Sequence, residues 1–220
     1  MDREDITESA KREFSTQVNK QEGEISSRII ENPKYLTEDQ KDSWNRNGFI
    51  LLKNFCSKEI CSEMNSSVLS IIDSMVGSEE AFSHAYANEG YIGIREMKPN
   101  PEAKTIHDEM SKIFRLHGKG VFNDFINNKR LLDLVEDILG INIDCFLSQY
   151  IFKNPGAWGQ PWHQDSSYFP FDRYPQVGAW VATSPATIEN GCLVILPGSH
   201  KEHLHEHVPD DREGSNYGYT

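Results

Sequence analysis

The feature that most constrains this chain is a change of pattern near residue 142. Before it, apolar residues recur at the spacing of amphipathic helices. After it, the apolar runs are short, and turn signals such as Asn154-Pro155-Gly156 and Pro197-Gly198 separate them. Helices followed by short strands predict an α+β domain that ends in a β-sandwich or jelly roll. The strand-like runs are residues 143–152, 177–183 and 192–196.

The first helix of this pattern has a start and a stop signal. Thr37 can accept a hydrogen bond from the backbone three residues on, where Gln40 completes a capping box. Gly48 suits the C-terminal cap of a helix that ends near residue 47. Residues 49–52 (Phe-Ile-Leu-Leu) are then typical of a buried strand.

The remaining helices are predicted from apolar spacing. A second helix should begin after Ser57 and extend through Ile72. Residues 77–101 contain Gly, Asn and Pro and predict loops and short strands. One helix or a pair of helices should cover residues 103–139, with Gly140 at its end.

Residues 1–35 are mostly polar and charged, so we expect a solvated, mobile segment ahead of one domain over residues 36–220. A segment that binds a partner or packs on the domain is the alternative.

Composition excludes several classes of function. Lys and Arg total 22 against 34 Asp and Glu, a net charge of -12, so the chain lacks the excess of cations that binds nucleic acid or an anionic membrane surface. No apolar window approaches the roughly 20 residues of a membrane span, and the charged first residues lack a signal peptide's apolar stretch. The four cysteines form no CxxC pair. We expect a soluble protein of the cytoplasm or another reduced intracellular compartment.

The most informative stretch is Gln160-Pro161-Trp162-His163-Gln164-Asp165. Side chains two residues apart on an extended backbone point to the same side, so His163 and Asp165 can present an imidazole nitrogen and a carboxylate oxygen together. These are two of the three ligands in the two-histidine-one-carboxylate triad of non-haem Fe(II) oxygenases. An isolated HxD tripeptide is more often an ordinary hydrogen-bonded pair, which is the alternative here.

The surrounding sequence resembles the phytanoyl-CoA dioxygenase family. The resemblance lies in residues 160–171, in Trp180 within Gly178-Ala179-Trp180-Val181-Ala182, in residues 189–200, and in the opening residues 36–55. It implies N-terminal helices packed on a double-stranded β-helix, the jelly roll of cupin-like folds. It also implies dependence on Fe(II) and 2-oxoglutarate.

The resemblance further implies roles for single residues. His163 and Asp165 would be the catalytic iron ligands. Trp180 would line the 2-oxoglutarate site, or simply pack in the core. Lys112 would bind a cosubstrate carboxylate, or be an exposed helix lysine. The other cofactor-binding candidates are Gln149, whose alternative is an inward strand glutamine satisfied by backbone, and Gln164.

Other residues near the motif have two readings of similar weight. Tyr168, Phe169 and Phe171 line a substrate channel or pack as core aromatics. Gly191 and Gly198 are expected at turns, where a permissive backbone is required.

The sequence departs from the family pattern after the motif. The family's second iron-binding histidine and the arginine for 2-oxoglutarate lie further downstream than Thr220, the last residue. We therefore expect the N-terminal portion of a longer protein or a truncated gene product, with a jelly roll short of its closing strands. The later histidines are expected in a solvated loop, with a replacement third ligand as the alternative: His200, His203, His205 and His207.

These observations predict a dioxygenase that hydroxylates a small-molecule or acyl substrate, uses O2 and decarboxylates 2-oxoglutarate to succinate and CO2, with ascorbate as a supporting reductant. Halogenation, the substrate and the oligomeric state stay open. The alternative is a catalytically incomplete jelly roll that serves as a binding module. A cupin that binds another metal is the third reading.

Overall fold

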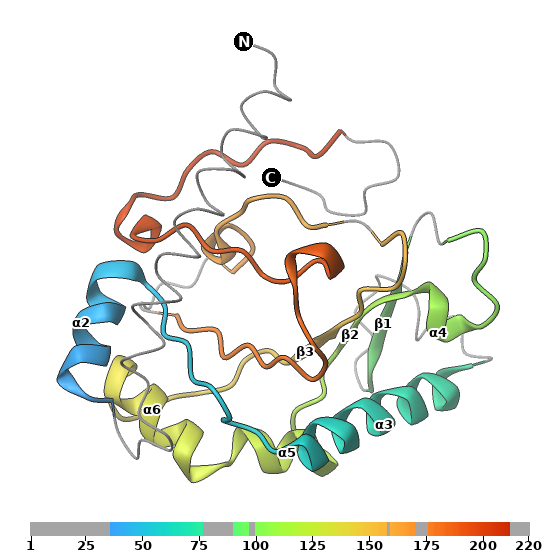
Figure 1. The fold of residues 1–220 in the computed structure, drawn as a ribbon, viewed down its shortest axis with the longest axis horizontal. Coiled ribbons are helices and arrows are strands. Elements are labelled where there is room, and N and C mark those ends of the chain that lie inside the picture. Colours follow the sequence, from blue (N-terminus) through green and yellow to red (C-terminus); the bar gives the residue numbers. More distant parts are fainter. Residues whose placement is uncertain (1–35, 77–89, 97–99, 158, 170–175, 212–220) are drawn as a thin grey trace. The chain divides into compact units, whose positions relative to one another are not determined.

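The computed structural model describes residues 36–76, 90–96, 100–157, 159–169 and 176–211. They divide into two compact units. One combines the described residues up to Phe55 with Pro197–Lys201, and the other combines Cys56–Leu196 with the described residues from Glu202 onward. Figure 1 labels their elements. The predicted polar segment 1–35 lies outside the described residues.

The first unit contains helix α2 (Glu38–Asn47) and the short 3-10 helix η4 (Ser199–Lys201). The capping box is confirmed: Thr37 Oγ1 accepts from the Gln40 amide at 3.3 Å, and Gln40 Oε1 accepts from the Thr37 amide at 2.9 Å. Gly48 ends α2 at φ +82°, as predicted. A β-carbon at Gly48 would lie 2.5 Å from the His200 ring, so the position requires glycine for its conformation and for space.

The second unit holds the sheet and the remaining helices. Helix α3 (Lys58–Met75) starts at the predicted cap Ser57, and α6 (Lys129–Leu139) ends at the predicted Gly140. Between them lie α4 (Ile106–Glu109) and α5 (Gly120–Ile126). Two short 3-10 helices follow the sheet, η2 (Asp165–Ser167) and η3 (Ile188–Asn190).

The sheet has three antiparallel strands in the order β1-β2-β3. They are β1 (Ile92–Arg95), β2 (Met110–Phe114) and β3 (Gln149–Ile151). Ile94 lies opposite Lys112 and Arg95 opposite Met110, so Ser111 is an extra residue on β2. This bulge explains why Met110 and Ser111 are both buried although strand side chains normally alternate.

Beyond the bulge, β2 alternates between two environments. Ile113 joins the core together with Val68 and Ile72 of α3, Met110 and Leu116, all 2% exposed or less. Lys112 and Phe114 point to the opposite face, away from this core, with Ile151 and Gln149 as their cross-strand partners. Helix α3 therefore covers one face of the sheet, and Lys112 lies on the other.

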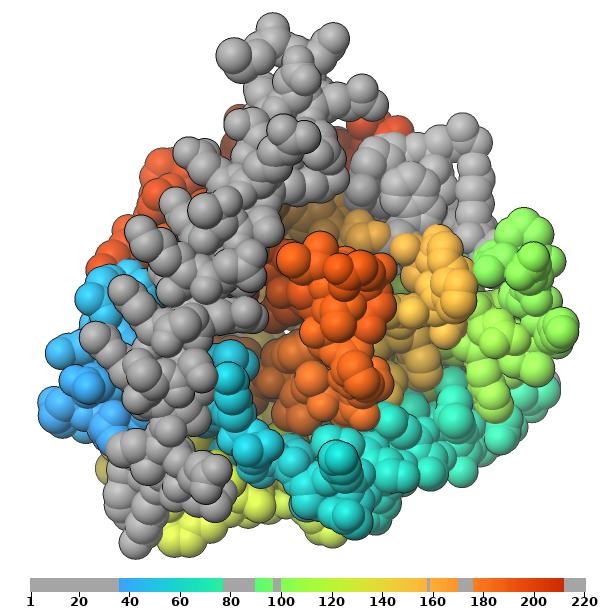
Figure 2. All heavy atoms as spheres, in the orientation of Figure 1, coloured from blue at the N-terminus to red at the C-terminus, as the bar shows by residue number. Residues whose placement is uncertain are grey.

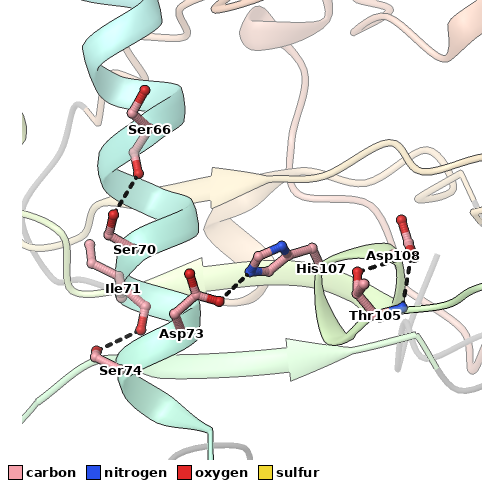
Figure 3. Close-up of polar contacts among 8 residues, drawn as sticks. All are labelled: Ser66, Ser70, Ile71, Asp73, Ser74, Thr105, His107 and Asp108. Atoms are coloured by element: carbon pink, nitrogen blue, oxygen red, sulfur yellow. Dashed lines mark hydrogen bonds and ion pairs between the residues drawn. The ribbon is translucent and has the colours of Figure 1, made fainter.

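A polar contact joins α3 to α4 (Figure 3). His107 Nε2 lies 2.8 Å from Asp73 Oδ1. Elsewhere on α3, Ser70 Oγ donates to Ser66 O at 3.1 Å and Ser74 Oγ donates to Ile71 O at 2.7 Å. Both serine hydroxyls donate to backbone carbonyls of their own helix and so do not join it to another element. In this view the contact between elements is the His107–Asp73 pair.

Some predicted elements differ from the structure. The helix predicted over 103–139 is wrong at residues 110–114, which form β2, because pairing with β1 and β3 overrides a weak local helical pattern. The strand predicted over 143–152 is reduced to β3. Residues 49–52, 177–183 and 192–196 form no strand, since none of them joins a ladder within the described ranges. The mixed helix and sheet content agrees with the predicted α+β class, with a small antiparallel sheet.

The apolar run predicted as the third strand lies on the surface instead. Leu193, Val194, Ile195 and Leu196 are each 38% exposed or more. In Figure 2, orange atoms of the segment that begins at residue 176 lie on the visible face next to the teal atoms of α3, in agreement with the contacts that Ala182 and Thr183 make with α3. Of the helices in the described part of the chain, none has both the length and the hydrophobicity that crossing a bilayer demands.

Ile72→Ala should lower the free energy of unfolding by about 3 kcal/mol, because it leaves a cavity against β2. Ile72 is 0% exposed, whereas Leu69 on the same helix is 40% exposed. Leu69→Ala is therefore the matched control, with an expected loss below about 1 kcal/mol. Urea denaturation followed by circular dichroism measures both, and equal losses would contradict the core described here.

Candidate functional site

The candidate site is assembled from β2 and from the loop that contains the HxD tripeptide, both in the second unit. Gln164 is extended, with φ -110° and ψ 126°, and Asp165 begins η2. An extended residue between His163 and Asp165 sends their side chains to the same side. His163 Nε2 lies 3.3 Å from Asp165 Oδ1.

The hydrogen bonds of His163 decide which of its nitrogens can bind a metal. His163 Nδ1 lies 2.7 Å from the Pro161 carbonyl oxygen, which only accepts, so Nδ1 carries a proton. In the neutral imidazole, Nε2 then has the lone pair and faces Asp165. Donors that bind one metal at about 2.1 Å and at right angles lie about 3 Å apart. The pair therefore fits two adjacent positions on a metal ion.

Without a metal, the same two groups form a hydrogen bond with each other. That bond to Asp165 raises the pKa of His163, and the contact with the Pro161 carbonyl raises it further, against the opposing effect of burial. The bond to His163 lowers the pKa of Asp165. A metal ion must displace the proton that this pair favours, so metal affinity should increase with pH while His163 loses its proton.

Gln160 connects the pair to Lys112. Lys112 Nζ donates to Gln160 Oε1 at 3.1 Å, and Gln160 Nε2 lies 3.1 Å from His163 Nε2. Burial lowers the pKa of Lys112 to about 8, and repulsion from Lys153 adds to the shift. Asp165 and Glu96 act in the opposite direction. The structure thus brings Lys112, His163 and Asp165 into one polar cluster.

Sequence reasoning did not assign roles to three members of this environment. Gln160 begins the stretch that contains the HxD tripeptide, but neither its residue type nor its position there indicates a role. Lys153 lies two residues after Ile151, the cross-strand partner of Lys112, and its charge acts on Lys112; the two-residue spacing could have indicated this proximity. Glu96 is buried, and its charge influences both lysines.

The other sequence-predicted residues lie as follows. Gln149 is exposed on β3, opposite Phe114. Trp180 is 51% exposed and precedes Ala182 and Thr183, whose carbonyls accept from α3 side chains. The Gln164 side chain contacts the backbone of residues 203–205.

The later histidines contact other groups. The His200 ring lies beside Gly48 in the first unit. His205 Nε2 is 2.9 Å from Glu202 Oε2, and the His203 and His205 rings are 4.5 Å apart. Within the described ranges, no group of three His, Cys, Asp or Glu side chains is arranged to hold a metal ion. His163 and Asp165 are thus a pair without a third such ligand in that part of the chain.

Aromatic rings adjoin the pair. The ring of Tyr168 lies edge-on to that of His163, with centroids 5.6 Å apart. Phe169 follows at 6.5 Å from Tyr168, and Phe146 at 5.3 Å from Phe169. Phe171, predicted with them, lies outside the described residues. Gly191 and Gly198 have φ of +82° and +85°, which confirms the prediction that they occupy turns.

Comparison with known proteins gives one family. The family model described as phytanoyl-CoA dioxygenase (PhyH) matches residues 44–218. "Phytanoyl-CoA dioxygenase 1" of Oryza sativa subsp. japonica is 24% identical over 212 residues, 84% of this chain and 72% of the relative. "Phytanoyl-CoA dioxygenase" of Arabidopsis thaliana is 27% identical, over 77% of this chain and 66% of the relative.

A further relative has a different printed name. "2-Aminoethylphosphonate dioxygenase" of an uncultured bacterium is 24% identical, over 80% of this chain and 63% of the relative. The chain spans about two thirds of the length of the curated relatives that it matches.

Lys112 should titrate near pH 8 in the folded protein, below the ordinary 10.5. Between these values the unfolded chain binds more protons than the folded one, so Lys112 should make the free energy of unfolding rise with pH across this window. Urea denaturation at pH 7.5 to 10 should show a smaller rise for Lys112→Met than for the wild type. Lys58→Met, at an exposed lysine, is the control, and equal slopes in all three proteins would refute the shift.

Proposed function

The chain belongs to the phytanoyl-CoA dioxygenase family, and from this premise we propose that it acts, alone or as part of a longer protein, as an Fe(II)- and 2-oxoglutarate-dependent dioxygenase. The observation that carries the proposal is the 3.3 Å separation of His163 Nε2 and Asp165 Oδ1, with His163 Nδ1 bonded to the Pro161 carbonyl so that Nε2 is the nitrogen that faces the carboxylate. A histidine nitrogen and a carboxylate oxygen suit Fe(II).

His163 and Asp165 would hold the iron, and Lys112 would bind a carboxylate of 2-oxoglutarate. Gln149 and Trp180 would line the cosubstrate. When bound, iron and 2-oxoglutarate supply O2 activation, with decarboxylation to succinate and CO2, and ascorbate keeps the iron reduced. The substrate would be a small molecule or an acyl compound, with hydroxylation as the proposed outcome.

The surroundings of Lys112 support its role. Burial disfavours the ammonium form, which is why its pKa falls to about 8. A cosubstrate carboxylate placed against Nζ would favour the charged form again, and a charge-assisted hydrogen bond of this kind is stronger than a neutral one. Gln160 accepts a hydrogen bond from Lys112 Nζ and also contacts His163. It would therefore keep the Lys112 and His163 side chains in fixed positions relative to each other.

The wider architecture is part of the proposal. We take residues 36–220 as one oxygenase domain because the family match covers residues 44–218. The three-stranded antiparallel sheet would belong to a double-stranded β-helix. All four cysteines are free, which suits a reducing compartment.

A catalytically incomplete binding module is the second candidate. It is favoured by the lack of a third histidine or carboxylate beside the pair in the part of the chain described. Succinate release from 2-oxoglutarate by the full-length gene product, with Fe(II) and ascorbate, supports the dioxygenase. No turnover under these conditions supports the binding module.

Metal binding tests the pair directly. Anaerobic titration of the chain with Fe(II) should show one site, and His163→Ala should weaken it by about tenfold or more, because one of two protein ligands is lost. His107→Ala is the matched control, since His107 also pairs with an aspartate, Asp73, at 2.8 Å. Equal Fe(II) affinity of His163→Ala and the wild type would reject the proposed site.

Cosubstrate binding tests Lys112. Lys112→Gln should raise the dissociation constant of 2-oxoglutarate for the Fe(II)-loaded protein by about tenfold, the equivalent of one lost charge-assisted bond, and should leave Fe(II) affinity within about twofold of the wild type. Lys153→Gln removes a neighbouring charge on the same face and should have the smaller effect. Calorimetric titration measures both constants, and a larger effect at Lys153 would transfer the role to that residue.

A further inference from the structure

Gln164, the residue between the two proposed ligands, is hydrogen-bonded at all four of its polar groups. Because its backbone is extended, its side chain points away from His163 and Asp165. Its carbonyl oxygen accepts from Ser167 N at 2.9 Å and from Ser167 Oγ at 2.8 Å. Its three remaining polar groups contact residues about 40 positions later in the chain.

Those three contacts all reach the histidine-rich stretch. Gln164 Nε2 donates to His203 O at 3.1 Å, and His205 N donates to Gln164 Oε1 at 2.7 Å. The Gln164 backbone amide donates to His207 Nε2 at 2.9 Å. His203 and His205 thus contribute backbone groups, and His207 alone contributes its side chain.

The two nitrogens of His207 are both in use. Nδ1 lies 2.8 Å from the His205 carbonyl oxygen and must donate to it, so Nε2 carries the lone pair that accepts from Gln164. This arrangement makes His207 a partner of the HxD backbone. It argues against His207 as the replacement third ligand, because no ring nitrogen is left for a metal.

We propose that His207, together with the Gln164 side chain, is a positioning residue of the metal site: it clamps the extended backbone from which His163 and Asp165 converge. The proposal rests on the proposed function, since it concerns the same two ligands. Rotation about the Gln164 backbone would separate the two side chains, and the clamp opposes that rotation. Partners of this kind, which orient ligands without binding the metal, affect affinity strongly.

The test uses Co²⁺, which does not require anaerobic handling, and three variants of the chain. His207→Ala removes the acceptor and should weaken Co²⁺ binding by about tenfold. His207→Gln restores a side-chain acceptor and should recover most of the affinity. His203→Ala is the matched control, because His203 contributes only its carbonyl oxygen to the clamp, and it should bind as the wild type does.

A second readout does not involve the metal. Hydrogen exchange of the Gln164 amide, measured by NMR in the metal-free protein, should be at least about tenfold faster in His207→Ala and close to the wild type in His203→Ala, because an amide without its acceptor is less protected. Thermal unfolding midpoints of the variants show whether a change in affinity reflects a general loss of structure.

The outcomes separate this inference from the proposed function. If the wild type binds Co²⁺ and His207→Ala binds it equally well, the positioning role is wrong. A loss of affinity in both His207→Ala and His207→Gln, with an altered visible Co²⁺ spectrum, would instead identify His207 as a ligand and overturn the inference. If neither the wild type nor His163→Ala binds Co²⁺, the proposed function is wrong. The positioning role is then wrong as well, even if amide exchange shows that His207 protects the Gln164 amide.

Discussion

The alternation of side chains along β2 is the constraint on which the rest of the second unit depends. Ile113 is fully buried against α3, so its neighbour Lys112 must face the opposite side. The bulge at Ser111 sets the phase of this alternation. A one-residue slip of the register would bury the lysine in the core and remove the cation from the HxD loop. Folding and the candidate chemistry are therefore coupled through one short strand.

A proton and a metal ion compete for the same two atoms of the HxD pair, His163 Nε2 and Asp165 Oδ1. In the structure the pair is a hydrogen-bonded histidine and aspartate, which favours a proton between them and shifts both pKa values accordingly. The same two atoms, 3.3 Å apart, suit a metal ion that takes the place of that proton. Lys112 and Gln160 complete a chain of polar contacts that ends at the same imidazole nitrogen. The Asp73–His107 pair, although closer at 2.8 Å, is a surface contact, with the Asp73 side chain 65% exposed.

Local signals predicted helix ends well and strands poorly. The cap at Thr37, the cap at Ser57 and the stop at Gly140 are each decided by hydrogen bonds or backbone angles within a few residues. Strands depend on partners elsewhere in the chain, so apolar residues such as Leu193, Val194 and Ile195 can lie exposed and form no strand. Residues 110–114 show the reverse case, because two neighbouring strands recruit a segment whose own pattern is helical.

The sequence by itself determined the family and the convergence of His163 with Asp165, since a two-residue spacing on an extended backbone places both side chains on one side. Only the tertiary structure decided which groups surround that pair. Gln160 reaches Lys112 across 48 positions, and Gln164 reaches His207 across 43. The physical reason is that local spacing fixes the neighbours of a residue within a few positions, whereas contacts over such distances depend on how the sheet and the loops pack.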